Sequence, residues 1–246
     1  MGQTGSLART HEGVPGLPRG RSRLPADEVL AAQRDRLVRA MTAAVAAHGY
    51  AQVTVADVVR RARVSRTAFY AHFADKQDCF FAATHLGAEA LFQATVDAVG
   101  SCSEQTGDEE LLRVGIRAFL RFLADEPAFA RAFYVDLPAA GDRAVDRLQV
   151  AYDRWGVRNR VWHERARRRH PDWPAVPADV YLALAGATGE LVRERVRRGA
   201  VAELPDLEDV IVGLHLAVLA GRSWPPGPGP GPAVVRLPTQ TSVSVV

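Results

Sequence analysis

The sequence predicts an all-α protein with a small N-terminal helical domain and a larger C-terminal helical domain. Between the two ends of the chain, apolar residues recur at spacings of three, four and seven, which is the period of a helix with one buried face. Gly and Pro residues divide this region into segments of helix length. The 246 residues suffice for one large core or two smaller ones. We therefore expect helical domains over residues 24–80 and 81–222.

The first helix is expected to begin near Pro25, because proline suits the first helical turn. It is expected to end at Gly49. Before it, residues 1–23 mix Gly, Pro, Arg and Ser without periodicity and are predicted to form a flexible basic arm. Three arginines of this arm suit an adjacent DNA minor groove, with an inert extension as the alternative. They are Arg19, Arg21 and Arg23.

The next two helices are short and form a helix-turn-helix by pattern. Thr54 and Asp57 have the spacing of a capping box, which predicts a helix over residues 55–62. Ser65 is a second N-cap and predicts a helix that ends near residue 71. Asp75 caps a longer helix over residues 76–100.

The rest of the chain is divided into five further helices by its own Pro and Gly residues. They are expected over residues 109–124, 128–135, 142–170, 178–198 and 207–219. After them, residues 223–246 are rich in Pro and Gly and predict a disordered tail.

Composition excludes several classes of protein. The two cysteines, Cys79 and Cys102, cannot form a disulfide framework or a four-cysteine zinc site, so we expect free thiols in a cytoplasmic protein. No apolar run is long enough to span a bilayer, and the first residues do not have the pattern of an export signal. No metal and no cofactor are expected.

Positive charge is concentrated near the N-terminus. Residues 1–80 contain 11 Arg and 1 Lys against 7 acidic residues, whereas residues 81–246 contain 19 Arg against 21 acidic residues. A basic N-terminal third indicates contact with a polyanion, although an arginine-rich composition alone explains the split equally well. Lys76 is the only lysine.

Residues 54–76, TVADVVRRARVSRTAFYAHFADK, resemble the DNA-binding signature of the TetR family of bacterial transcriptional regulators. The resemblance is specific over about residues 33–83 and is only architectural beyond them. It implies a DNA-binding domain over residues 24–80, with the helix-turn-helix at about 54–73. Arg63 departs from the pattern, because the family usually has Gly at this left-handed turn position, where another residue costs about 1 kcal/mol.

The resemblance implies that Thr54, Tyr70 and Lys76 bind the phosphate backbone. Arg66 begins the second helix, from which a guanidinium can donate to guanine O6 and N7. Thr67 and Ala68 are small enough for close approach to a thymine methyl, and His72 is a further phosphate or base contact. The candidate DNA contacts are Thr54, Ser65, Arg66, Thr67, Ala68, Tyr70, His72 and Lys76.

The resemblance also implies a ligand pocket among the middle helices. Aromatic residues recur there at helical spacing, and most are expected to be core. A mostly apolar lining predicts a hydrophobic or aromatic small-molecule ligand. The candidate lining residues are Phe119, Phe122, Tyr134, Trp155 and Trp162.

The last two helices predict a homodimer. Residues 210–220 are apolar around the whole helix, which therefore needs cover on all sides, and a partner subunit can supply it. Members of the family dimerise through a four-helix bundle of these two helices, which implies the same here. The candidate interface residues are Gly186, Gly189, Ile211, Leu214 and Val218.

These features predict a dimeric repressor that a small apolar ligand releases from a palindromic operator. One alternative is a DNA-binding regulator without an inducer, acting through protein contacts. The other is a helical enzyme. The sequence contains no H-E-x-x-H, G-x-S-x-G or P-loop motif and no paired-cysteine metal motif, so no enzyme activity and no catalytic residues are expected.

Overall fold

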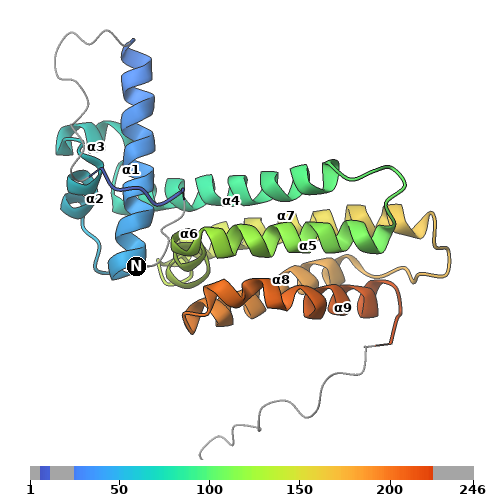
Figure 1. The fold of residues 1–246 in the computed structure, drawn as a ribbon. Coiled ribbons are helices and arrows are strands. Elements are labelled where there is room, and N and C mark those ends of the chain that lie inside the picture. Colours follow the sequence, from blue (N-terminus) through green and yellow to red (C-terminus); the bar gives the residue numbers. More distant parts are fainter. Residues whose placement is uncertain (1–5, 12–24, 224–246) are drawn as a thin grey trace, which may run out of the picture.

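The computed structural model describes residues 6–11 and 25–223, and every regular element within these ranges is helical. Figure 1 shows a small unit of three helices at one end of a layered bundle of long helices. The predicted all-α fold is confirmed.

The small unit consists of α1 (Ala26–His48), α2 (Val55–Ala62) and α3 (Arg66–His72). Three residues separate α3 from the long helix α4 (Lys76–Gly100). The side chains of Thr54, Ser65 and Asp75 accept hydrogen bonds from the first turns of the helices that follow them. These three N-caps explain why the predicted starts of α2, α3 and α4 agree with the structure.

The bundle continues with α5 (Asp108–Asp125), α6 (Pro127–Arg131), α7 (Asp142–Arg167), α8 (Ala178–Arg197) and α9 (Glu208–Leu219). Two differences from the expected helices are found. A π-helical turn, η1 (Ala132–Asp136), replaces the second half of the helix expected over 128–135. A 3-10 segment, η2 (Val201–Leu207), precedes α9.

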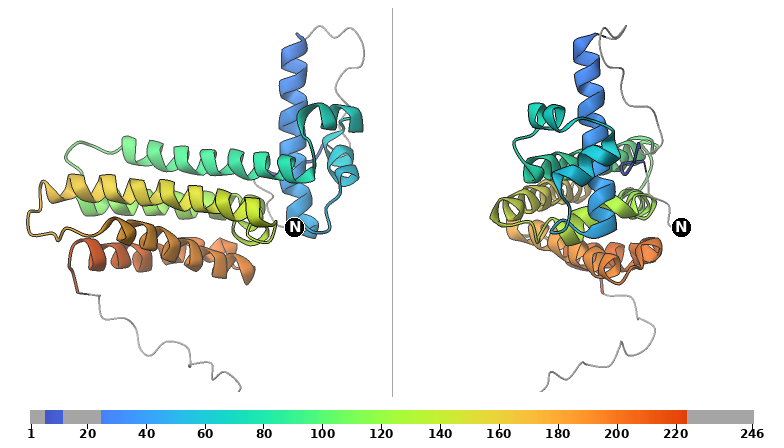
Figure 2. Two further views of the ribbon diagram at one scale, coloured as in Figure 1. Left: turned by 180° about the vertical axis from the view of Figure 1, so that it is seen from behind. Right: turned by 90° about the vertical axis from the view of Figure 1, so that its left-hand side faces the viewer.

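The long helices form layers that extend away from the small unit (Figures 1 and 2). α4 forms one outer layer, α5 and α7 lie in the middle, and α8 with α9 forms the layer farthest from α4. Since α4 leaves the small unit and runs along the bundle, it is the direct covalent and packed connection between the two units.

The two units share one continuous apolar core. Buried side chains of the small unit, among them Met41 and Phe69, belong to the same cluster as Phe129 and Leu120 of the bundle. Within the bundle, Gly87 lets α4 approach α6 closely, because a Cβ there would lie 2.2 Å from the Phe129 ring. The small unit is therefore packed on the bundle.

Residues 6–11 correct the prediction that residues 1–23 form a flexible arm. The Glu126 carboxylate accepts hydrogen bonds from the backbone N–H groups of Ser6, at 2.6 Å, and Leu7, at 3.0 Å. The Leu7 side chain is buried, and the His11 N–H donates to the Arg61 carbonyl at 2.7 Å. Buried apolar contact and satisfied backbone groups hold this segment, and neither was visible in its Gly- and Pro-rich surroundings.

The remaining predictions for the ends of the chain lie outside the described residues. They concern Arg19, Arg21 and Arg23 and the tail over residues 224–246. Across the ranges that the structure describes, no helix combines the length and the apolarity that a membrane crossing requires.

Candidate functional site

The turn between α2 and α3 has a left-handed residue at the position where the family resemblance implies one. Arg63 ends α2 with φ 55° and ψ 40°, in the left-handed region. Thr54 and Asp57 form a complete capping box at the start of α2. The hydrogen bond from the Thr54 hydroxyl lowers the pKa of the Asp57 carboxyl. The capping box fixes where α2 begins, and the backbone turn at Arg63 sets the angle at which α3 leaves α2.

The outward face of α3 is open to solvent. Arg66 and Thr67 are exposed, and Tyr70 is 49% exposed, which is unusual for a large aromatic side chain. Arg66 lies over the Tyr70 ring at 5.7 Å, and its Nη2 is 3.5 Å from the Tyr70 hydroxyl. Phe69 is fully buried on the opposite face of the helix. The structure thus presents a guanidinium, a hydroxyl and a phenol together on one exposed face.

The hydroxyls of Thr54 and Ser65 already serve the helix caps. Thr54 Oγ1 donates to Asp57 Oδ2 at 2.7 Å, and Ser65 Oγ accepts from the Ala68 N–H at 3.1 Å. Both residues are exposed, Thr54 at the start of α2 and Ser65 at the start of α3. For Thr54, a phosphate contact requires that its donated proton leave Asp57.

Lys76 has a different environment from the free cation that the sequence suggests. Its Nζ donates to the carbonyls of Tyr50 at 3.1 Å and Val53 at 2.9 Å, and lies 4.5 Å from the centre of the Tyr50 ring. These carbonyls belong to the loop between α1 and α2. Lys76 therefore ties the start of α4 to the loop that leads into α2, a role that a single sequence does not reveal.

His72 faces α1 at the end of α3. Its Nε2 lies 3.3 Å from Gln33 Oε1, and burial, followed by the charge of Arg34, lowers the pKa of the imidazole. Ala68 is half-buried, so its methyl lies at the edge of the exposed face. The eight candidate DNA contacts therefore lie between the start of α2 and the start of α4, and they have unequal access to solvent.

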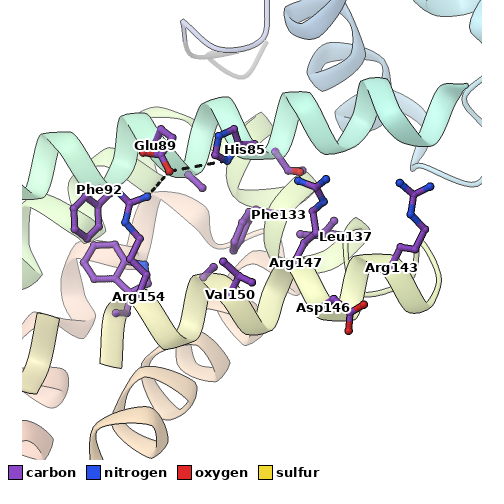
Figure 3. Close-up of a pocket in the computed structure, with 14 residues that line it drawn as sticks. His85, Glu89, Phe92, Phe133, Leu137, Arg143, Asp146, Arg147, Val150 and Arg154 are labelled. Carbon is purple, nitrogen blue, oxygen red and sulfur yellow. Dashed lines mark hydrogen bonds and ion pairs between the residues drawn. The ribbon is translucent and has the colours of Figure 1, made fainter. Parts of the chain in front are cut away.

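Two cavities lie in the bundle next to each other. The first, cavity A, has a volume of about 410 Å³ and lies between α4 and α7 (Figure 3). The second, cavity B, has a volume of about 440 Å³ and is mostly apolar. Phe92, Arg154 and Trp155 line both, so these three residues separate the two spaces.

Four of the five predicted pocket residues line cavity B. They are Phe119, Tyr134, Trp155 and Trp162. Phe122 lines neither cavity, because its ring packs against Phe129 at 6.2 Å in the core. Its inclusion was wrong, since helical spacing alone does not distinguish a core face from a cavity face.

The polar members of the two cavities were missed in the sequence. Arg154 pairs with Glu89 of α4, and this contact lowers the pKa of the Glu89 carboxyl. Figure 3 shows Glu89 between Arg154 and His85, with Arg143 and Arg147 farther along α7. Arg158 lines cavity B. The four-residue spacing of Arg143 and Arg147, and of Arg154 and Arg158, was the available signal.

The predicted dimer residues divide into two groups. Ile211 is fully buried within the chain, and a Cβ at Gly189 would lie 2.7 Å from the Tyr152 ring, so both face inward and cannot touch a partner. Their assignment to the interface was wrong, because an apolar helix does not show which of its faces points to its own core. Gly186, Leu214 and Val218 are at least partly accessible.

Comparisons with known proteins match both the small unit and the whole fold. Residues 37–83 match the model of the family described as bacterial regulatory proteins, tetR family. The fatty acid degradation regulator FadR from Bacillus halodurans is 18% identical, with a TM-score of 0.65, over 75% of this chain and 94% of that chain.

Two further solved structures share the fold. FadR from Bacillus subtilis in complex with stearoyl-CoA is 14% identical, with a TM-score of 0.65, over 75% of this chain and 98% of that chain. A TetR-like transcriptional regulator from Rhodococcus sp. RHA1 is 21% identical, with a TM-score of 0.60, over 81% of this chain and 100% of that chain. The segment that contains α2 and α3 therefore matches the tetR family model, and the chain shares its fold with these three solved structures.

Proposed function

We propose that the chain binds a palindromic DNA operator as a homodimer and is released from it by a small ligand with an apolar body. The observation that carries the proposal is the exposed face of α3 within the segment that matches the family model. A short helix with Arg and Thr in its first turn suits direct contact with base edges in the major groove.

The contacts divide into two kinds. Arg66 is assigned to base recognition, with Thr67 and Ala68 allowing close approach. Tyr70 and the caps at Thr54 and Ser65 are assigned to the phosphate backbone. His72 ends α3 and Lys76 begins α4, and their first role is to hold α3 against α1 and the α1–α2 loop in place.

A dimer follows from the outer face of α8 and α9. Val210 is 42% exposed and Val218 37% exposed on α9, and Leu214 lies between them on the same face. Gly186 of α8 has open space around it, so a partner backbone can approach closely. A two-fold axis through this face would place two copies of α3 on two half-sites.

The ligand is assigned to cavity B. Its volume of about 440 Å³ lies within the range of small-molecule sites, and its aromatic lining suits an apolar body. The Bacillus subtilis relative in fold was solved with stearoyl-CoA, which has a long apolar chain. Thr95 and Phe92 of α4 line the cavity, so a ligand there contacts the helix that continues from α3. The ligand can weaken DNA binding only by as much as it binds the DNA-free arrangement of the two domains more tightly than the DNA-bound arrangement.

The test is DNA selection from a random pool with the full-length chain, followed by measurement of DNA release by candidate ligands. We expect a palindromic site, and a relaxed sequence preference for Arg66→Ala, because one bidentate contact gives about 1–3 kcal/mol of discrimination. Arg160→Ala is the matched control, since Arg160 pairs with Glu164 on the exposed side of α7, away from α3.

Three results would separate the proposals. A palindrome whose sequence preference Arg66→Ala leaves unchanged would refute the assignment of that residue. A monomer in solution, with Val218→Glu equal to the parent chain in DNA affinity, would refute the dimer. Selective DNA binding that no small molecule weakens would favour the regulator without an inducer.

A further inference from the structure

Arg158 is a half-buried cation on the wall of a mostly apolar cavity. It projects from α7 into cavity B, where its Nη2 donates to the Thr95 carbonyl at 3.3 Å. Among residues 6–11 and 25–223, no carboxylate lies within ion-pair distance of its guanidinium. Burial lowers the pKa of Arg158, in the direction expected for a charge that has lost water without gaining a counter-ion.

The charges around Arg158 do not balance. Its guanidinium lies 5.8 Å from the centre of the Phe92 ring and 5.9 Å from that of Trp155, the two aromatic residues that separate the cavities. The guanidinium of Arg154 lies over the same Phe92 ring at 3.6 Å, but it is paired with Glu89. Of the two guanidinium groups at this junction, only that of Arg154 has a carboxylate partner, so the positive charge of Arg158 is not balanced.

This arrangement is costly for the chain alone. A charge that has lost part of its water is destabilising unless it is paired and hydrogen-bonded, and one 3.3 Å bond to a carbonyl satisfies little of the half-buried guanidinium, which has five donors. Arg165 also lines cavity B, but it is exposed and keeps its water. The Thr188 hydroxyl, on the cavity wall, is buried without a hydrogen-bond partner in the described chain. The wall of the cavity therefore carries two polar groups, the Arg158 guanidinium and the Thr188 hydroxyl, whose capacity for hydrogen bonds the chain does not fill.

We propose that cavity B binds a monoanionic amphipathic molecule, such as a long-chain or aromatic carboxylate or sulfonate. Its apolar body lies against Trp155, Trp162 and their neighbours, and its anionic group pairs with Arg158. The ligand class proposed for cavity B depends on the proposed function only in that the ligand is assigned to this cavity. A planar guanidinium binds a carboxylate or sulfonate through two parallel hydrogen bonds, so Arg158 selects charge while the aromatic wall selects apolarity.

The test uses two fluorescent probes of the same shape and different charge, with the full-length chain. Anilinonaphthalene sulfonate carries the anion, and N-phenylnaphthylamine is the same aromatic body without it. We expect the sulfonate to bind about 10- to 100-fold more tightly than the neutral probe, which corresponds to a charged hydrogen bond in a buried site. Dodecanoate should displace both probes, and methyl dodecanoate should do so more weakly.

Arg158→Gln should remove the preference for the anion while leaving the affinity for the neutral probe within about twofold. Arg158→Lys keeps the charge and should retain part of the preference, which covers the case in which the glutamine variant does not fold. Arg160→Gln, two residues along α7 on its exposed side, should behave like the parent chain.

Equal binding of the two probes by the parent chain would overturn the proposal, as would binding of neither. An anion preference that survives Arg158→Gln in a folded protein would also overturn it. DNA binding is measured in parallel on the same variants. Charge-selective probe binding without any effect on DNA would refute ligand-controlled release and leave the anion site standing, so the two proposals fail separately.

Discussion

Replacing Lys76 by Met tests whether this residue holds the loop before α2 or binds phosphate. The substitution removes the hydrogen bonds from Nζ to the carbonyls of Tyr50 and Val53, at 3.1 and 2.9 Å, and a cation 4.5 Å from the Tyr50 ring. The Val53 carbonyl directly precedes Thr54, the N-cap of α2. Loss of the ammonium therefore loosens the loop that sets the position of the helix-turn-helix.

The magnitude follows from the number and environment of these bonds. A hydrogen bond to a charged group contributes about 1.5–3 kcal/mol when buried, and less when water can replace the donor. Both bonds here are only part-buried, so we expect the free energy of unfolding to fall by about 1–3 kcal/mol in total. The free energy of DNA binding should weaken by a similar amount, because the loop and α2 hold α3 in position.

Urea unfolding and DNA binding over a range of salt concentrations provide the assay. Lys76→Arg is the matched variant, since it keeps the charge but changes the donor geometry at the carbonyls. We expect Lys76→Arg to lose stability as well. Unchanged stability in Lys76→Met, with the salt slope of DNA binding reduced by about one and restored in Lys76→Arg, would refute this reasoning and assign the ammonium to a phosphate.

Arg63→Gly should be more stable than Arg63→Ala by about 1 kcal/mol in urea unfolding, because only glycine adopts the left-handed conformation at φ 55° without strain, and equal stabilities would contradict this. Gly87→Ala should lower the unfolding free energy by about 1–3 kcal/mol, because a Cβ there meets the Phe129 ring at 2.2 Å, whereas Gly186→Ala, with open space around it, should not. Burial lowers the pKa of both His163 and His215, so the folded protein favours their neutral forms. Their contribution to the free energy of unfolding is therefore full above the ordinary histidine pKa of about 6.5, and it is lost as the pH falls toward the lowered pKa values. Urea unfolding between about pH 7 and 5 should show this loss, and a flat profile would contradict it.

Local interactions explain which parts of the fold could be predicted from the sequence. Thr54, Ser65 and Asp75 cap helices through atoms only three residues away, so their signals are complete in a short stretch of sequence. Arg63 adopts the left-handed conformation that the family resemblance implies at this turn, although the residue itself departs from the family's usual Gly.

Interactions over long separations explain the errors. Ile211 and Gly189 lie on helices whose apolar residues extend to both sides, and only the packed bundle shows that these two face inward. Glu126 holds Ser6 across 120 positions, which no periodicity reveals. Lys76 was singled out correctly as unusual, but its carbonyl partners lie 23 to 26 residues away. The cavities are likewise a property of the packing, so Arg158 was missed although the aromatic lining was largely found.

The position of α3 on DNA is measured most directly by cleavage from a single residue of its exposed face. A copper–phenanthroline group attached to Thr67→Cys would serve, with Cys102 replaced by Ser, while burial raises the pKa of the Cys79 thiol and keeps it unreactive. With the selected operator, we predict cleavage at two symmetric positions in the major groove, and none from the same group at Ala183→Cys on α8. Cleavage that is scattered along the duplex, or equal from both attachment sites, would contradict a recognition helix in the groove.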